Sequence, residues 1–283
     1  MRYAFACSDL DALSESMDRN GFAVACDVLD AAEIAMLSDD VRKTLDPNGD
    51  VTLAGGNRYC TDYAERSPGL LTLLEHERWR RVYDHLLGTS DLVIHRSAAI
   101  VRAPGDGGMG WHTDRGEWTG VFDANSALNR LDIPNGMWFY LTGCRPSHGG
   151  LAVIAGSHKL DYRAPAGYTL SEDRARFHPA GQPDEPLPME VPGAVGIECG
   201  PGDLLMFADR TFHAARPNRE QIVRLSCAMI MRPDQPEFTV PWGATPSARA
   251  FAAGLPPRLQ RYARGYTGID HAWRPEPTAV AAG

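Results

Sequence analysis

The chain has 283 residues, 43% of them hydrophobic, and a formal net charge of −8. That length allows a substantial buried core, while an acidic balance without any basic block argues against nucleic acid or an anionic membrane as a partner. No apolar run approaches the roughly 20 residues that cross a bilayer, no secretory pattern opens the chain, and six scattered cysteines form no CxxC pair, so we expect a cytoplasmic protein without a disulfide framework.

The first ninety residues have a helical pattern with a short strand inside it. Ser8 is a suitable N-cap for a helix whose apolar stripe contains Leu13 and Met17, and Gly21 is placed to end that helix. The apolar run 22–25 that follows predicts a short strand.

Two further helices are predicted before residue 90. Asp30, followed three residues later by Glu33, has the pattern of a capping box and begins a helix with apolar residues at helical spacing. Ser67 and Pro68 are typical residues for a helix start, and we expect a third helix from there to about Gly88.

From residue 91 the pattern changes to short apolar or alternating runs bounded by Gly, Pro and Asp, which are typical of strands. Several short strands separated by turns predict a closed or sandwiched antiparallel sheet, a β-barrel or jelly roll with helices packed outside it. The predicted strands lie within 91–103, 136–143, 149–157, 202–208 and 221–231.

The chain is expected to form one domain over 1–283, with a helical part over about 1–90, a β core over about 91–232 and a C-terminal extension over 233–283. The stretch 161–192 is polar, rich in proline and without periodicity. A loop of that length in a compact domain is usually functional, and we interpret it as a lid loop.

The segment "GMGWHTDRGEW" holds His112 and Asp114 two residues apart. Residues i and i+2 of an extended chain face the same side, so both side chains are expected to project into the barrel, with Thr113 facing away. An imidazole and a carboxylate on one face bind one edge of a metal ion, and a third ligand completes the two-histidine, one-carboxylate set of non-haem Fe(II) oxygenases. Alone, this pattern is a weak signal, since an ordinary histidine near an aspartate has the same sequence.

The segment "GDLLMFADRTFHAARPNREQIVRLS" strengthens the metal interpretation. A turn at 202–203 leads into a strand, His213 is expected at the far end of that strand, and Arg224 follows eleven residues later in a second strand-like run. A buried arginine in a strand is costly unless an anion pairs with it. A substrate or cosubstrate carboxylate suits this position, and the alternative is a structural salt bridge to a buried acid.

Together, these segments resemble the phytanoyl-CoA dioxygenase family. The likeness rests on "WHTD", "GGLAVIAGSHK", "GDLLMFADRTFH" and the arginine eleven residues after that histidine, and it extends from "GFAVACDVLDAAEIAML" to about Met231. The resemblance implies a double-stranded β-helix, a jelly-roll variant, in an α+β but mainly β fold with flanking helices. It also implies a dioxygenase that depends on Fe(II), 2-oxoglutarate and O2.

Carried onto this sequence, the resemblance makes His112, Asp114 and His213 the iron ligands. It makes Arg224 the clamp for the distal carboxylate of 2-oxoglutarate. Because Asp114 is intact, and halogenating relatives replace that carboxylate with a small residue, chlorination is not expected.

Two further cosubstrate contacts follow from the same resemblance. Trp138 falls at the strand tryptophan of the family and is expected to line the cosubstrate pocket. Ser226 would share a strand face with Arg224 and add a hydroxyl to the clamp. The chain departs from the family pattern at Ala155, where proline is frequent, and at Ala215, where a small polar residue sometimes stands.

The resemblance implies oxidation of an unactivated C–H bond in a small-molecule intermediate of natural-product biosynthesis, by hydroxylation or by desaturation or oxidative cyclisation. We expect a monomer or homodimer. One alternative is an acyl-CoA hydroxylase of the same family, although the net charge of −8 does not favour a basic surface for CoA. A second is a non-catalytic or 2-oxoglutarate-independent cupin-like metalloprotein, in which an inward-facing Arg224 would have no purpose.

The remaining histidines have structural interpretations. His148 and His158 flank "GGLAVIAGS" and fit turn or capping positions better than metal ligation. His76 and His85 fall in an arginine-rich helix and are expected to be solvated, and His95 lies in a strand as a core or pocket residue.

Several residues near the motif remain open to two interpretations. Arg102 and Arg115 are candidates for binding polar groups of a substrate, while Trp111 and Trp118 are expected in the core. The polar cluster 57–59, in "AGGNRYCTDY", either reaches the open side of the iron or forms a plain surface loop.

Overall fold

The computed structural model describes residues 1–51, 57–114, 134–159, 161–171, 176–182, 187–234, 240 and 242–273. The α-helices are α1 (Leu10–Asn20), α2 (Ala31–Leu45), α4 (Pro68–Leu71), α5 (Glu77–Leu87) and α6 (Pro246–Gly254), and the 3-10 helices are η1 (Tyr63–Glu65), η2 (Thr72–Glu75) and η6 (Gln260–Ala263). The strands are β1 (Ala4–Ala6), β2 (Phe22–Cys26), β3 (Asn57–Thr61), β4 (Leu92–Arg102), β5 (Met109–His112), β6 (Pro134–Tyr140), β7 (Leu151–Ile154), β8 (Tyr168–Leu170), β9 (Phe177–Pro179), β10 (Ala194–Gly196), β11 (Leu204–Ala208), β12 (His213–Ala215) and β13 (Arg224–Pro233).

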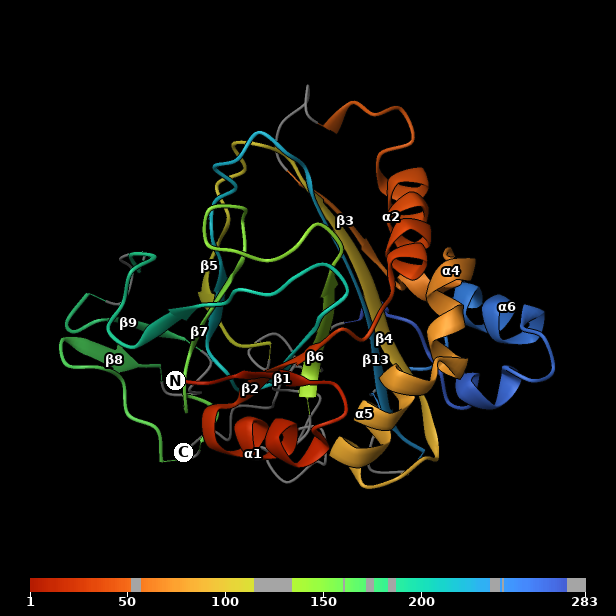
Figure 1. The fold of residues 1–283 in the computed structure, drawn as a ribbon, viewed down its shortest axis with the longest axis horizontal. Coiled ribbons are helices and arrows are strands. Elements are labelled where there is room, and N and C mark those ends of the chain that lie inside the picture. Colours follow the sequence, from red (N-terminus) through yellow and green to blue (C-terminus); the bar gives the residue numbers. More distant parts are fainter. Residues whose placement is uncertain are drawn as a thin grey trace, which may run out of the picture.

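Two sheets stacked face to face form the body of the molecule (Figure 1). The large sheet has the order β1-β2-β11-β6-β13-β4-β3, and the small sheet has the order β10-β7-β12-β5. All pairings in both sheets are antiparallel except that of β1 with β2. The predicted jelly-roll core with flanking helices is therefore confirmed.

Successive side chains of β13 point to opposite faces of the large sheet. Leu225, Cys227 and Met229 belong to a core that also contains residues of α2 and α5, which cover the outer face of the large sheet (Figure 1). The side chains of Arg224 and Ser226 alternate with these and face the small sheet. Arg224 and Ser226 thus lie on the inner face of this strand.

A second core fills the space between the sheets. Tyr140 and Leu205 contribute from the large sheet, and Leu151 and Val153 contribute from the small one. All four are buried, so this core is closed to solvent.

The N-terminal helices form where the sequence predicts them, but α1 has a different N-cap residue. The α1 N-cap is Asp9 rather than Ser8, and its side chain makes no capping bond. Gly21 ends α1 in the left-handed conformation, with φ of +81°. The capping box of α2 is present, because Asp30 accepts the Glu33 amide and Glu33 accepts the Asp30 amide.

The predicted third helix is interrupted at His76. This residue is extended, with ψ of 116°, and separates η2 from α5. Its Nδ1 accepts the Trp79 backbone N–H at 3.1 Å, and its Nε2 lies 2.9 Å from Glu33 Oε1. The prediction that His76 is solvated was wrong, because the imidazole replaces a conventional N-cap oxygen and joins α5 to α2. His85, further along α5, is about one-third exposed.

The prediction that His213 ends the strand after residue 203 was also wrong. That strand, β11, ends at Ala208 in the large sheet, and His213 begins β12 in the small sheet. A turn closed by the Thr211 amide and the Ala208 carbonyl carries the chain between them. Local periodicity does not reveal such a crossing, since both strands are apolar.

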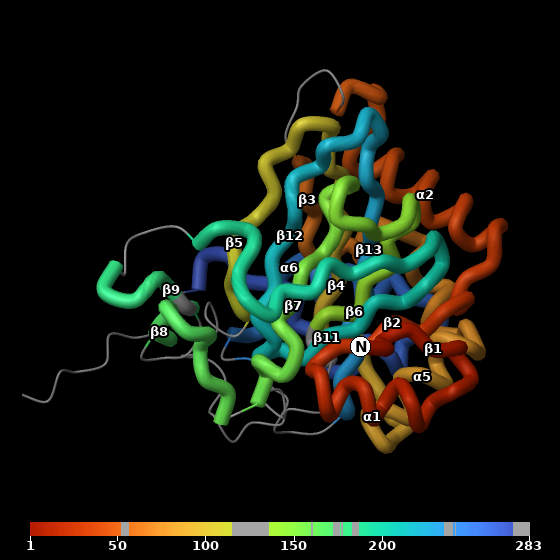
Figure 2. Tube along the Cα trace, turned by 60° about the vertical axis from the view of Figure 1, so that its left-hand side comes forward, coloured from red at the N-terminus to blue at the C-terminus, as the bar shows by residue number. Residues whose placement is uncertain are grey.

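Part of the predicted lid lies against the outer face of the small sheet. Trp111 and Phe212 form a buried cluster there with Val191, and residues of the 161–171 and 187–189 segments pack against it. Trp111 Nε1 donates to the carbonyl of Pro188 at 3.2 Å. Figure 2 shows β8 and β9 on this same side, away from the large sheet. The lid itself remains a prediction.

The C-terminal extension lies beside α4 and the edge of the large sheet (Figure 1). Tyr266 donates to Asp62 Oδ1 at 3.1 Å, and His271 Nε2 is 3.1 Å from Thr61 Oγ1 on β3. Among the described residues, no helix is both long and apolar enough to cross a membrane.

Candidate metal centre and cosubstrate pocket

The structure brings His112, Asp114 and His213 together at the end of the small sheet. The pairing of β5 with β12 sets His213 directly opposite His112. Asp114 Oδ1 lies 3.5 Å from His213 Nε2 and 3.9 Å from His112 Nε2. One ligand atom from each residue lies within 4.8 Å of the others, which is the arrangement of a three-ligand metal site.

Backbone carbonyls fix both imidazoles for ligation. His112 Nδ1 is 2.8 Å from the Gly110 carbonyl, and His213 Nδ1 is 2.9 Å from the Thr211 carbonyl. A carbonyl only accepts, so each Nδ1 carries a hydrogen, and each Nε2 faces Asp114, where loss of any proton leaves a lone pair for a metal. Metal-binding histidines are oriented in the same manner.

The pKa shifts keep Asp114 ionised and His112 neutral, as binding of a divalent cation requires. Burial, together with repulsion from His213, lowers the pKa of His112 to about 4. Burial by itself would raise the pKa of Asp114, but the imidazoles of His213 and His112 outweigh it and bring that pKa to about 2. Burial opposes the charge on His213, but Asp114 outweighs it and raises the pKa of His213. A carboxylate facing two imidazole nitrogens is the donor set of non-haem Fe(II) sites with open positions, so these residues fit iron.

Polar groups of the "GSHK" turn hold the segment that precedes His213. Ser157 Oγ donates to the Ile154 carbonyl at 2.6 Å and accepts the Phe212 amide at 2.9 Å. Thr211 Oγ1 donates to the Gly21 carbonyl at 2.8 Å. His158, which packs over Gly21, contacts the Asp18 carbonyl at 3.1 Å through Nε2. Ser157 thus supports the segment that leads to a candidate ligand, a role that the sequence did not indicate.

Arg224 lies inside the sandwich as a cation without a carboxylate partner among the described residues. It is 2% exposed. Its guanidinium donates to the Gly149 carbonyl and, at 3.5 Å, to Ser226 Oγ, and its Cζ atom lies 4.9 Å from the Tyr140 ring centroid. A buried charge held only by neutral groups is costly, and an anionic ligand removes that cost. The salt-bridge alternative is realised instead by Arg102, which pairs with Asp106.

The other two predicted cosubstrate contacts share this inner face. Ser226 is fully buried and lies opposite Tyr140, and Trp138 lies opposite Ala228 and Leu205. Trp138 packs against both hydrophobic cores. Both residues therefore border the interior that Arg224 enters.

Other residues singled out in the sequence have assigned positions. His148 is fully buried and forms an isolated antiparallel β-bridge with Asn218. Trp111 packs in the buried cluster on the outer face of the small sheet. Arg58 donates to Asp50 and to the Leu45 carbonyl. Arg115 and Trp118 lie outside the described residues.

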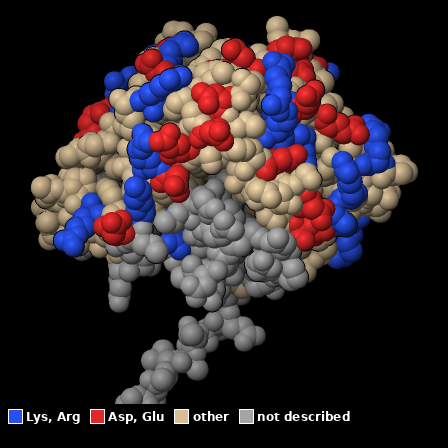
Figure 3. Space-filling view, turned by 60° about the horizontal axis from the view of Figure 1, so that its bottom comes forward, with Lys and Arg blue, Asp and Glu red and all other residues tan. Residues whose placement is uncertain are grey.

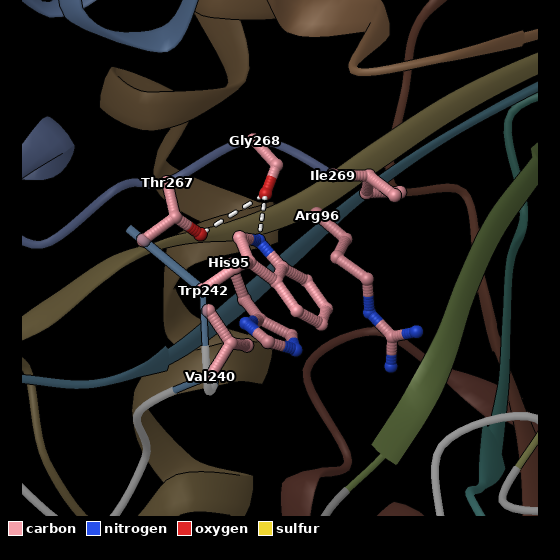
Figure 4. A pocket seen from close by; sticks show the side chains of 7 residues that line it. All are labelled: His95, Arg96, Val240, Trp242, Thr267, Gly268 and Ile269. Carbon is pink, nitrogen blue, oxygen red and sulfur yellow. Dashed lines mark hydrogen bonds between the residues drawn. The ribbon is translucent and has the colours of Figure 1, made fainter. Parts of the chain in front are cut away.

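A small pocket lies between β4 and the C-terminal extension, and none of the three candidate metal ligands lines it (Figure 4). It is formed by His95 and Arg96 of β4 and by Val240, Trp242, Thr267, Gly268 and Ile269 of the C-terminal extension. Trp242 donates to the Gly268 carbonyl at 2.9 Å. Arg96 extends away from Trp242, and its charge contributes to the low pKa of Asp114 (Figure 4). His95, which the sequence places in a strand as a core or pocket residue, is buried in β4 and lines this pocket.

Comparisons with known proteins agree with this geometry. The family model described as "Phytanoyl-CoA dioxygenase (PhyH)" matches residues 17–226, about three quarters of the chain. No curated protein matches the sequence.

Solved structures share the fold at low sequence identity. The epimerase SnoN, in complex with Fe3+, α-ketoglutarate and nogalamycin RO, is 21% identical with a TM-score of 0.57, covering 84% of this chain and 93% of that one. EctD from S. alaskensis is 22% identical with a TM-score of 0.56, covering 78% and 75%. HygX from Streptomyces hygroscopicus, with nickel, 2-oxoglutarate and hygromycin B bound, is 18% identical with a TM-score of 0.56, covering 81% and 88%. With the extent of the family match, these findings establish that the chain belongs to the phytanoyl-CoA dioxygenase family of iron- and 2-oxoglutarate-dependent oxygenases.

Proposed function

We propose that this protein oxidises an unactivated C–H bond of a small-molecule intermediate in natural-product biosynthesis, with His112, Asp114 and His213 as iron ligands and Arg224 as the 2-oxoglutarate clamp. One observation carries the proposal. The three-ligand cluster and a buried arginine without a carboxylate partner among the described residues enter the same interior from opposite sheets.

The protein's own residues would hold and orient the reactants. Bound Fe(II), with 2-oxoglutarate and O2, supplies an oxidant able to take hydrogen from an unactivated C–H bond. Arg224 would hold the far carboxylate with two parallel hydrogen bonds, with Ser226 and Trp138 bordering the same pocket. The apolar core between the sheets would keep water from the reacting groups and fix their distance.

The substrate class rests on neighbours of the same fold. SnoN was solved with nogalamycin RO and HygX with hygromycin B, and both are small molecules. The alternative of an acyl-CoA substrate is less favoured, since basic and acidic side chains are interspersed on the face in Figure 3 and form no broad basic surface there. Hydroxylation, desaturation and oxidative cyclisation all begin with the same hydrogen removal.

Two predictions accompany the proposal. We expect a cytoplasmic protein, supported by six cysteines that are all free. We expect a monomer or homodimer that takes a small molecule as its only obligatory partner.

Anaerobic titration tests the cofactor assignment. Fe(II) and then 2-oxoglutarate are added to wild type, His112→Ala, Arg224→Ala and, as a control, Arg58→Ala on the outer side of β3. We expect the visible charge-transfer band of the chelate in wild type and Arg58→Ala, its loss in His112→Ala, and a need for far more 2-oxoglutarate in Arg224→Ala. A wild type that binds iron but gives no band would favour the cupin-like metalloprotein instead.

A further inference from the structure

A contact between Gly136 and Phe207 lies directly behind the metal centre. The two residues face each other across β6 and β11. A Cβ atom placed on Gly136 would lie 2.1 Å from Cε1 and Cζ of the Phe207 ring, a separation that real Cβ atoms essentially never show. Gly136 has no positive φ, so space rather than backbone conformation requires glycine here.

The Phe207 ring that occupies this space also packs on a candidate ligand. Its centroid is 4.6 Å from that of His213, at an interplanar angle of 42°. The His213 ring in turn lies 4.2 Å from the His112 ring. Phe207 is 2% exposed and His213 is 4% exposed. The β6 backbone, Phe207, His213 and His112 thus follow one another in contact.

His213 needs support because the chain around it is irregular. The register of β11 against β6 shifts immediately after Phe207, and the chain then turns toward the small sheet. His213 begins a strand of three residues, and its ring makes one backbone hydrogen bond, through Nδ1 to Thr211. The Thr211 carbonyl and Asp114 contact the two ring nitrogens, and the Phe207 ring packs on a face of the imidazole that neither of them supports.

We infer that Phe207, seated on Gly136, is a positioning residue for the iron ligand His213, and that Gly136 is glycine because any side chain there would drive the Phe207 ring into that ligand. The inference rests on the proposed iron site. It makes the identity of residue 136, on the opposite sheet, a determinant of metal affinity.

Cobalt binding tests this without a substrate. Co(II) is titrated anaerobically into purified wild type, Gly136→Ala, Phe207→Leu and the double variant, with visible absorption bands as the readout. Melting of the metal-free proteins is followed in parallel. Gly69→Ala in α4 is the matched control, because its added Cβ would lie 2.5 Å from Asp40 Oδ2, on the helical side of the large sheet.

We expect Gly136→Ala to weaken Co(II) binding about 10- to 100-fold, the range for groups that orient a metal ligand, and to shift the absorption bands. Phe207→Leu should weaken binding less. The double variant should bind as Phe207→Leu does, because leucine leaves room for the new methyl group. Gly69→Ala should lower the melting temperature and leave the bands unchanged.

Three results separate the possibilities. If Gly136→Ala melts earlier, as Gly69→Ala does, but binds Co(II) like wild type, Phe207 is only a core residue and the inference is overturned. It is also overturned if the double variant loses affinity additively. If wild type binds no Co(II), the proposed iron site itself is wrong. If Gly136→Ala does not fold, the spectrum and affinity of Phe207→Leu decide, and wild-type values there overturn the inference.

Discussion

The two sheets support their functional side chains in different ways. The large sheet presents Arg224 from β13, a strand of ten residues that pairs with β4 along its whole length and with β6 in part. The small sheet presents the histidines from β5 and β12, which have four and three residues. The arginine is thus carried by a continuous strand ladder, whereas the histidines depend on the turn serine, the carbonyls and the phenylalanine around them. Mutations should therefore act differently on the two sides.

Removing the candidate metal ligand that follows β5 should have the largest effect on iron binding. Asp114→Ala leaves two imidazoles without a carboxylate, and we expect Fe(II) affinity to fall more than about a hundredfold, beyond the range for groups that only orient ligands. Equilibrium dialysis with Fe(II) under argon measures this. Asp39→Ala, at an exposed ion pair of α2, is the control. Near-normal iron binding by Asp114→Ala would place the metal elsewhere.

Substituting Arg224 of the large sheet should weaken 2-oxoglutarate binding and leave the metal affinity unchanged. Arg224→Gln removes a charge from two hydrogen bonds worth about 1.5–3 kcal/mol each, so we expect the Kd of 2-oxoglutarate to rise at least about tenfold. Arg224→Lys should be intermediate, because it keeps the charge without the planar fork. Calorimetry on the protein loaded with Co(II) gives both constants. A parallel loss of metal affinity would contradict the separation of the two sides.

Weakening a support of the small sheet should give a smaller effect. Ser157→Ala leaves the buried Phe212 amide without its acceptor, and we expect a loss of about 1–2 kcal/mol in the free energy of unfolding, with modestly weaker metal binding. Ser147→Ala, whose hydroxyl bonds the partly exposed Glu220, should lower the free energy of unfolding much less. Urea denaturation of the metal-free protein compares them. Equal stability of the two variants would show that the turn does not support β12.

Changing a helix outside both sheets should have the smallest effect. Asp30→Ala removes the capping box of α2, and we expect a loss of about 1 kcal/mol in stability with unchanged metal and 2-oxoglutarate binding. Asp11→Ala, nearly fully exposed in α1, is the comparison in thermal denaturation. A change in metal affinity in Asp30→Ala would mean that the helices, and not the sheets alone, set the geometry of the centre.

Local patterns in the sequence predicted the elements and indicated the site residues. The capping box at Asp30 and the strand periodicity of β4 and β13 needed only neighbouring residues. The spacing of eleven residues between His213 and Arg224 marked both as candidates for the site. These signals depend on residues close in sequence, and they predict local structure only.

The sequence did not predict which residues of distant strands lie opposite each other, because the register between such strands is not encoded locally. Nothing near Phe207 indicates that it faces Gly136, about seventy residues away. The crossing from β11 to β12 takes place over the polar residues 209–211, a pattern that fits an ordinary turn as well as a change of sheet. His76 caps a helix although histidine is not a usual N-cap. Each of these outcomes was decided by packing between elements.

With the proposed role of Arg224 as the 2-oxoglutarate clamp, its buried guanidinium would link the stability of this protein to the supply of that cosubstrate. A folded chain without a carboxylate ligand keeps a desolvated charge that the unfolded chain would return to water. A ligand that binds only the folded form adds about 2.7 kcal/mol of stability at a hundred times its Kd. Cells short of 2-oxoglutarate would then hold this enzyme in a form that opens more often and is degraded sooner, so its abundance would follow the carbon status of the cell.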